Sequence, residues 1–556
     1  MFSSKLRRWA LGIMALLVLL GAAFWAAGGR TGLMLLSVKH FIRQDYKPGP
    51  EVQWAVAPAD TTDGAKRPNI ILIVADDLGF NDITAHGGGV AQGTVPTPHI
   101  DSLAQGGVDF LAGYSGNATC APSRAAMMTG RYPTRFGFEF TPTPKQFMKV
   151  ITSNPGPDVA NKPVYHPERE ADLIPYEDMG LPTSEVTLAR ALKQSGYRTL
   201  HLGKWHLGDS PQFRPYAHGF DESLSLLHGA SMFLPESSPQ VVNAKQDFDL
   251  IDKFLWAAHP WGIRFNAGEV FQPPRYMTDY LTDEAIKAID ANKKQPFFMY
   301  LAYNAPHTPL QATREDYDAL PHIADHTTRV YAAMIRSLDR NIGRVLTHLK
   351  TSGLDENTLI VFTSDNGGAH YIGVPELNKP YRGWKATFYE GGVRVPFFMK
   401  WPQGLPRQVS YPQPISHLDI FSTALAAAQA KPPEGKVLDG VNLLPFLKGD
   451  DSKAPHQQIF FRTDTYLAMR QGDWKLQVME RPKMDVLYNL RQDPGERHNL
   501  AQQEPERLQQ MKRDLLAINA QQIKPLWPSL GEGSIRLDKT LKDPYDAKDA
   551  FVYYAN

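Results

Sequence analysis

Two patterns of apolar and polar residues alternate along most of the chain. Uninterrupted apolar runs rich in β-branched and aromatic residues predict buried strands, and they lie at 69–75, 197–202, 296–303, 358–363 and 395–400. Stretches with the spacing of amphipathic helices lie between them, at 98–107, 188–196, 278–292, 328–349 and 416–428. Strands that alternate with helices predict an α/β sheet with right-handed crossovers.

The pattern changes after about residue 433. Four short alternating runs separated by turn signals predict an antiparallel sheet, at 458–462, 466–470, 474–479 and 486–490, followed by a helix at 505–520. We therefore expect a large α/β domain over 68–432 and a smaller α+β subdomain over 433–525. Residues 526–556 are rich in Pro, Gly and Asp and are expected to form a surface tail.

The N-terminus carries a segment directed to a membrane. Lys5, Arg7 and Arg8 precede an uncharged stretch of 19 residues at 9–27, close to the length that spans a bilayer. Residues 1–29 therefore read as a signal peptide or an uncleaved membrane anchor. A buried core helix is disfavoured because the stretch has no polar face. Either reading places the protein in the cell envelope or periplasm, with 30–67 as a linker.

Composition excludes several classes of function. Lys plus Arg total 59 and Asp plus Glu 58, for a net charge of +1, whereas a dedicated nucleic-acid binder usually shows a basic excess. The chain of 556 residues has one cysteine. An intrachain disulfide and a zinc site built on several thiolates are therefore excluded.

Polar residues follow three of the predicted central strands. Asp76-Asp77 ends the first, Asp365-Asn366 ends the strand at 358–363, and the strand at 296–303 runs into His307. Ligands bind beyond the carboxyl ends of strands in open α/β sheets. Carboxylate and amide oxygens suit a hard cation, Ca²⁺ or Mg²⁺. Taken singly, each motif is also explained as a solvated turn.

The one cysteine lies in a longer pattern of motifs. Cys120-Ala121-Pro122-Ser123-Arg124 is followed by Thr129-Gly130-Arg131. Further phrases stand at 75–79, 203–208 (GKWHLG), 305–307 (APH), 364–368 (SDNGG), 382–385 (RGWK), 390–394 (EGGVR) and 487–490. Over roughly 68–515 the chain resembles the type I, formylglycine-dependent sulfatases. Its motifs are most similar to those of arylsulfatase B, the N-acetylgalactosamine-4-sulfatases. Because animal members carry disulfides that this chain cannot form, we expect a bacterial member.

The resemblance implies a fold and an activity. The fold would be alkaline-phosphatase-like, with a large mixed sheet between helices. A formylglycine-generating enzyme would oxidise Cys120 to formylglycine. One hydroxyl of the hydrated aldehyde would attack the sulfur of an aryl sulfate or a sulfated carbohydrate, and the second would allow the sulfated intermediate to collapse and release sulfate.

The resemblance also assigns roles to individual residues. The cation, with Ca²⁺ favoured over Mg²⁺, would be held by Asp76, Asp77, Asp365, Asn366 and the modified residue 120. Asp365 would also act as the base for attack, and Arg124 and Lys204 would orient the diol. His206 would take the proton during collapse, His307 and Lys385 would contact sulfate, and His307 would protonate the leaving oxygen. With neutral histidines the site would carry about +2, which attracts anionic esters.

Two other functions remain open at this point. One is a phosphate or phosphonate ester hydrolase that also uses formylglycine, and the other is a non-catalytic envelope protein that binds sulfated glycans. Alone, His206 and His307 would read as structural histidines, and Lys204 and Lys385 as surface charges. Substrate specificity is expected in 138–180, 209–275 and 369–381, with five rim candidates: Phe138, Glu139, His370, Tyr371 and Tyr381.

Overall fold

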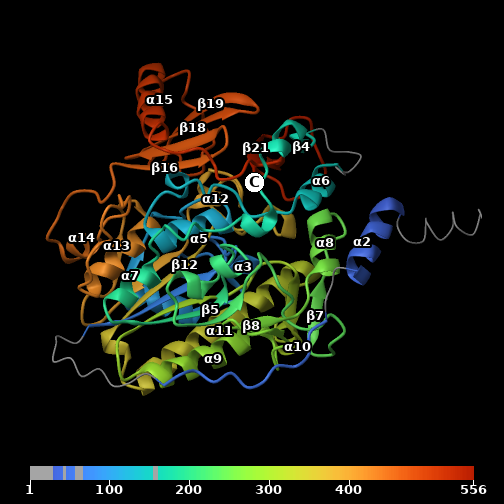
Figure 1. The fold of residues 1–556 in the computed structure, drawn as a ribbon. Helices are drawn as coiled ribbons and strands as arrows, with labels where there is room; N and C mark the ends of the chain where they lie inside the picture. The colour runs from blue at the N-terminus through green and yellow to red at the C-terminus, as the bar shows by residue number, and fades with distance from the viewer. Residues whose placement is uncertain (1–28, 42–44, 57–66, 154–160) are drawn as a thin grey trace, which may run out of the picture.

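A computed structural model describes residues 29–41, 45–56, 67–153 and 161–556. Its centre is a ten-stranded sheet (Figure 1). The strands follow in the spatial order β14 (Val409–Tyr411), β2 (Val108–Phe110), β13 (Phe397–Lys400), β12 (Thr358–Ser364), β1 (Asn69–Ala75), β10 (Phe297–Ala302), β5 (Arg198–Lys204), β6 (Glu222–Leu226), β8 (Ile263–Phe265) and β9 (Val270–Phe271). The five neighbours β12, β1, β10, β5 and β6 are parallel. β13 runs antiparallel to β12, so the sheet is mixed, which confirms the expected fold class.

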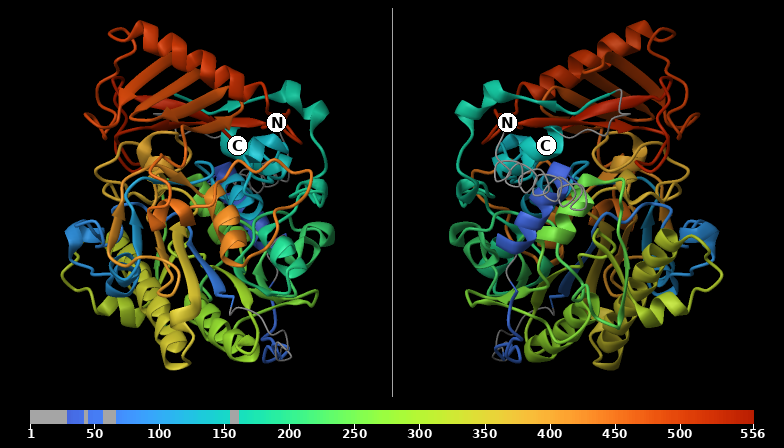
Figure 2. Two further views of the ribbon diagram at one scale, coloured as in Figure 1. Left: turned by 90° about the vertical axis from the view of Figure 1, so that its left-hand side faces the viewer. Right: turned by 90° about the vertical axis from the view of Figure 1, so that its right-hand side faces the viewer.

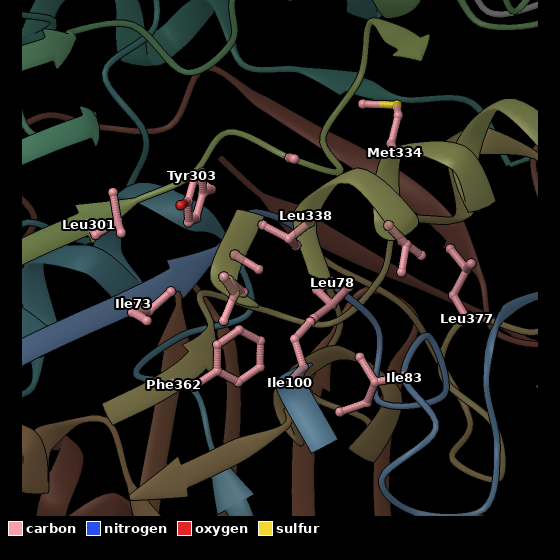
Figure 3. Packing of buried hydrophobic residues seen from close by; sticks show 14 of the residues in the cluster. Ile73, Leu78, Ile83, Ile100, Leu301, Tyr303, Met334, Leu338, Phe362 and Leu377 are labelled. Carbon is pink, nitrogen blue, oxygen red and sulfur yellow. The ribbon is translucent and has the colours of Figure 1, made fainter. Parts of the chain in front are cut away.

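Helices cover both faces of this sheet. Side chains of β1 alternate between two apolar clusters, with Ile71 and Ile73 in one and Ile70 and Leu72 in the other, as the period of two requires. The first cluster includes residues of α4 (Pro98–Gln105), α9 (Met277–Asn292) and α11 (His326–Thr351), and Figure 3 shows part of it. The second includes residues of α5 (Cys120–Thr129), α7 (Leu188–Gln194) and α13 (Leu418–Ala427).

A C-terminal sheet forms a separate layer at one end of the molecule (Figure 2). It contains β16 (Gln458–Thr463), β17 (Tyr466–Gln471), β18 (Trp474–Glu480) and β19 (Lys483–Asn489), all antiparallel. α15 (Pro505–Asn519) packs on this sheet and buries Met511 and Leu515 against it. These elements agree with the antiparallel sheet and helix expected from the sequence.

Shorter elements connect the layers. The helices are α2 (Gly29–Phe41), α3 (Val90–Gly93), α6 (Lys145–Ser153), α8 (Leu250–Ala258), α10 (Arg314–Asp318), α12 (Glu390–Val393) and α14 (Leu444–Lys448). Two-stranded sheets join β11 (Leu310–Thr313) to β7 (Val241–Ala244) and β15 (Ile415–Ser416) to β3 (Gly113–Tyr114).

Two segments are more ordered than the sequence suggested. Within the expected linker 30–67, Trp54 is buried and its indole donates a 2.9 Å hydrogen bond to Glu284 of α9. The expected surface tail 526–556 holds β20 (Gly531–Arg536) and β21 (Phe551–Ala555), which form a sheet with β4 (Val164–Tyr165). Tyr554 and Val552 of this tail are buried. Aromatic residues between turn residues were the local signal for this packing.

The predicted membrane-directed segment lies largely outside the described residues, which begin at 29. Among those that are described, every helix is too short or too polar to cross a bilayer.

Candidate active site

The carboxyl ends of four neighbouring parallel strands bring the predicted residues together. Asp76 and Asp77 follow β1, Asp365 and Asn366 follow β12, and Lys204 is the last residue of β5. Between β1 and β5, β10 leads into the loop that carries His307. Backbone hydrogen bonds tie these ends together: Asp76 N–H donates to the Ala305 carbonyl at 3.0 Å, and Asp77 N–H donates to Asp365 Oδ1 at 3.1 Å.

Cys120 enters this strand-end site from the first turn of α5. Its Sγ lies 3.6 Å from Oδ1 of Asp76 and 3.6 Å from Oδ1 of Asp77, and the residue is 3% exposed. Burial and then Asp365 raise the pKa of the Cys120 thiol above its ordinary value. Because the thiolate is the nucleophilic form of cysteine, the unmodified residue is a poor nucleophile in this environment.

The side chains of the site fit a divalent cation. Ligand atoms of Asp76, Asp77, Cys120 and His307 lie within 4.8 Å of one another. Asn366 Nδ2 donates to Asp77 Oδ1 at 2.8 Å, while Asn366 Oδ1 is buried and has no hydrogen-bond partner among the described residues. A buried acceptor without a partner is costly, and a hard cation among carboxylates would satisfy it.

Cationic side chains face each of the three carboxylates, and Asp76 has two of them, Lys204 and Arg124. Lys204 Nζ lies 2.8 and 2.7 Å from the two oxygens of Asp76, and Lys385 Nζ donates to Asp77 Oδ2 at 2.8 Å. Arg124 donates to Asp365 Oδ2 through Nε at 2.9 Å and lies 2.7 Å from it through a terminal nitrogen. These pairs fix the orientation of the acidic oxygens.

The aspartates differ in pKa because their neighbours differ. Burial raises the pKa of Asp76 to about 7, against the opposing effect of Lys204. Burial acts on Asp77 and Asp365 in the same direction, but nearby cations outweigh it. Lys385 and His307 hold the pKa of Asp77 below its usual range, and the effect of Arg124 lowers the pKa of Asp365 to about 2. Asp365 is therefore ionised.

Two histidines complete the site. His307 Nδ1 lies 2.5 Å from the Thr308 carbonyl, and Lys385 Nζ lies 3.3 Å from its Nε2. These partners place the proton on Nδ1 and leave Nε2 as an acceptor. Burial lowers the pKa of His307 to about 3. Burial and then Lys204 also lower the pKa of His206, and its Nδ1 is buried without a partner among the described residues, so both rings are neutral.

The five residues expected at the rim of the site have different surroundings in the structure. Tyr371 lies in the site, since its hydroxyl donates to Asp77 Oδ2 at 2.8 Å and accepts from Lys385 at 3.1 Å. His370 is next to it and half-buried.

The other three rim candidates have different surroundings. Glu139 is buried and paired with Arg462, at 2.6 Å. Phe138 packs edge-on against Trp527, with ring centroids 5.4 Å apart. Tyr381 lies under the guanidinium of Arg394, 4.4 Å from its ring centroid. Phe138 and Glu139 are core residues, and the expectation that they line a rim is wrong.

Two residues that contact the site or the turn before Cys120 were not predicted from the sequence. The Tyr300 hydroxyl accepts a hydrogen bond from Arg124 at 3.1 Å, from within the run at 296–303 that reads as purely structural. The Tyr554 hydroxyl, from the C-terminal strand β21, donates to Asn117 at 2.7 Å and lies 3.2 Å from Thr119 Oγ1. Both contacts join residues far apart in sequence, so no local pattern points to them.

Comparison with known proteins agrees with this fold. The family described as Sulfatase matches residues 68–430, and a C-terminal family described as N-sulphoglucosamine sulphohydrolase matches 382–521. The chain is 30% identical to N-acetylgalactosamine-6-sulfatase of Mus musculus over 472 residues, covering 78% of this chain and 82% of the relative. It is 32% identical to the steryl-sulfatase of Homo sapiens over 466 residues, covering 72% and 73%.

A solved structure described as Ps i-CgsB in complex with k-i-k-neocarrahexaose superposes with a TM-score of 0.68 at 34% identity, covering 83% of this chain and 95% of that chain. The chain belongs to the sulfatase family and is a sulfuric ester hydrolase.

Proposed function

We propose that the protein hydrolyses sulfate monoesters of carbohydrates, with residue 120 acting as formylglycine and a bound Ca²⁺ ion as cofactor. The observation that carries the proposal is the position of Cys120. Its side chain lies 3.6 Å from the carboxylates of Asp76 and Asp77, which could bind a cation. Three cationic side chains pair with the carboxylates of the site: Arg124, Lys204 and Lys385. A formylglycine at this position would supply two hydroxyls from its hydrate, next to groups that attract a sulfate ester.

The chain's own residues divide the work of binding and proton transfer. Lys204 pairs with Asp76 and Lys385 with Asp77, and both lysines would bind sulfate oxygens as negative charge builds up on them. Asp365 is ionised and fixed by Arg124, which suits a base for the attacking hydroxyl. His206 is neutral and would accept a proton when sulfate is released.

Proton donation to the leaving oxygen is best served by a pair of residues. His307 Nε2 faces the Lys385 ammonium at 3.3 Å. The lysine is therefore the member of this pair that carries a proton to donate. We propose that Lys385 and His307 act together to protonate the leaving oxygen. Lys385→Ala would then slow an ester with a poor leaving group, such as a sugar alcohol, more than an aryl sulfate with a good one.

A Ca²⁺ ion would bind the oxygens of Asp76, Asp77, Asp365 and Asn366 with residue 120. Bound there, it would supply Lewis-acid stabilisation of charge on the sulfate. The donor set is entirely oxygen once residue 120 is modified, and such sets accept Ca²⁺ with its flexible coordination more readily than Mg²⁺ with its strict octahedron.

The proposed substrate class draws support from the relatives. The relatives reported above include an N-acetylgalactosamine-6-sulfatase and a structure containing a neocarrahexaose. The motif phrasing resembles the 4-sulfatases. A panel of 4-sulfated and 6-sulfated N-acetylgalactosamine, with a steroid sulfate beside them, tests the class and the sulfate position together.

Paired esters of one aryl alcohol test the reaction itself. Matured protein with Ca²⁺ is expected to hydrolyse 4-nitrophenyl sulfate with a higher kcat/KM than 4-nitrophenyl phosphate. A preference for phosphate above about tenfold, or about 1.4 kcal/mol in transition-state binding, would establish the formylglycine-dependent phosphate or phosphonate hydrolase instead.

Maturation and location belong to the same proposal. A formylglycine-generating enzyme would modify Cys120, and residues 1–29 would carry the chain to the envelope or periplasm. Mass spectrometry of the tryptic peptide that ends at Arg124, taken from the native host, should show the aldehyde. Wholly unmodified cysteine would favour the non-catalytic glycan-binding role. Fractionation of the host that found the protein in the cytoplasm would contradict the export signal.

A further inference from the structure

A second group of cationic residues lies next to His206, near the segment that follows β6. Trp205 N–H donates to the Leu226 carbonyl at 2.8 Å, and His206 N–H donates to the Leu227 carbonyl at 3.2 Å. A Cβ atom on Gly229 would lie 2.8 Å from Cε1 and from Nε2 of the His206 ring. The segment after β6 therefore runs directly against the site, and His228 lies at its border.

His228 is held in a fixed orientation with an exposed side chain. Its Nδ1 lies 2.7 Å from Asp209 Oδ2, and its side chain is 58% exposed. Tyr176 donates to the same Asp209 oxygen at 2.6 Å. The Asp209 carboxylate raises the pKa of His228. Because Nδ1 is engaged by Asp209, Nε2 is the nitrogen that remains for a ligand.

Two arginines extend the positive charge away from His206. Arg264 lies on β8, where it pairs with Ser225 of β6, and it acts electrostatically on His228. Burial and then the positive charge of Arg214 lower the pKa of Arg264. The ionisable neighbours of Arg264 also include Glu269, Tyr46 and Tyr216. We call His228, Arg214 and Arg264 the basic edge.

His228 of the basic edge pairs with the Asp209 carboxylate, whereas the two arginines donate to backbone carbonyls. Arg214 Nε donates to the Asp209 carbonyl at 2.9 Å, and Arg264 donates to the Gly268 carbonyl. Arg264 Nε is buried and has no hydrogen-bond partner among the residues that the structure describes. Within the described ranges, neither arginine has a carboxylate oxygen within 4.0 Å. An anion bound here would supply the two guanidinium groups with the direct ion pair that they lack.

We propose that the basic edge is a subsite for a second anionic group on the substrate. The preferred substrate would then be an acidic oligosaccharide, with one sulfate ester at residue 120 and a sulfate or carboxylate on a neighbouring sugar at the basic edge. Guanidinium groups bind either anion through paired hydrogen bonds. This inference rests on the proposed function, because it extends the binding surface of the same site.

The test compares substrates that differ in one charge. Matured, Ca²⁺-loaded enzyme is assayed on a monosulfated disaccharide with a neutral neighbouring sugar, on the same disaccharide with a second sulfate, and on one with a uronic acid neighbour. 4-Nitrophenyl sulfate reports the reaction without the subsite. At least one acidic disaccharide should have a kcat/KM about tenfold above the neutral one, as one charge-assisted interaction allows.

Variants assign the preference to the basic edge. Arg264→Gln should reduce the ratio of acidic to neutral kcat/KM about tenfold, mainly through KM, and Arg264→Lys should keep part of it. His228→Asn removes a charge at an exposed side chain, so folding is not at risk, and should also reduce the ratio. Arg407→Gln is the control, since Arg407 is exposed and pairs with the exposed Glu356, at 3.4 Å.

The outcomes separate the two proposals. If the wild type hydrolyses 4-nitrophenyl sulfate but shows no acidic preference, or if Arg264→Gln and His228→Asn leave the ratio unchanged, the subsite is overturned and the proposed function stands. If no sulfate ester is hydrolysed, the proposed function fails and the subsite fails with it. A preference for only one acidic disaccharide identifies the anion as sulfate or as carboxylate.

Discussion

The loop that carries Lys385 rests on the C-terminal sheet through a buried ion cluster, and this support can be tested by mutation. Lys475 of β18 lies 2.8 Å from Glu390 Oε1 and 3.1 Å from Glu496 Oε1, and all three side chains are fully buried. Glu390 opens the short helix α12, a few residues after Lys385. Lys475→Met would therefore leave two buried carboxylates facing each other.

The size of the effect follows from the partners that remain. Removing one member of a buried ion pair costs about 3–5 kcal/mol. Glu390 keeps Arg394, at 3.2 Å, and the Tyr114 hydroxyl, at 2.7 Å. Burial raises the pKa of Glu496 to about 7, so a proton can neutralise it in the variant. We expect a loss of about 2–4 kcal/mol, at the lower end at pH 6 and at the upper end at pH 8.

The assay is urea unfolding, with the midpoint compared at unchanged slope. Lys483→Met, at an exposed position on β19, is the matched control. The double variant Lys475→Met/Glu496→Gln should recover at least about 1 kcal/mol, since it removes the carboxylate left without a cation. A loss below about 0.5 kcal/mol for Lys475→Met, or a double variant no more stable than the single one, would refute the reasoning.

Three further predictions concern the site and its surroundings. Removal of divalent cations with a chelator should abolish sulfate ester hydrolysis and lower the melting temperature, and Ca²⁺ should restore both better than Mg²⁺; full activity after chelation would contradict the cation site. Tyr371→Phe removes the hydroxyl between Asp77 and Lys385 and should reduce kcat/KM up to about tenfold with an unchanged melting temperature. Burial raises the pKa of Asp82 to about 8, against about 3.9 in an unfolded chain, so stability should fall as pH rises between these values. Melting curves of Asp82→Asn should lack this part of the pH dependence, and an identical slope in both proteins would show that Asp82 does not take up the proton.

The convergence of strand ends could be predicted from the sequence, for a physical reason. Buried parallel strands have continuous apolar sequences, and polar residues directly after them must meet at one edge of the sheet. Asp76, Asp365 and His307 were found in this way. The motif around Cys120 then added a helix N-terminus that no apolar pattern would place among these strand ends.

Contacts between distant segments could not be predicted in this way. Glu139 lies in a segment of unremarkable composition, and only the fold shows that Arg462 neutralises it. The C-terminal tail looked like a surface segment because Pro, Gly and Asp dominate it, yet Tyr554 contacts the turn before Cys120. β13 reads as one more central strand, and its antiparallel direction follows from the connection rather than from its sequence.

The central claim is that residue 120 needs two hydroxyl groups to complete a catalytic cycle, and turnover by Cys120→Ser tests it most directly. Serine offers one hydroxyl at the same position, so the variant should fold with the wild-type melting temperature. It should release at most one aryl alcohol per protein molecule from 4-nitrophenyl sulfate and then stop, while Cys120→Ala releases none. Sustained turnover by the serine variant at the rate of the matured wild type would contradict the claim.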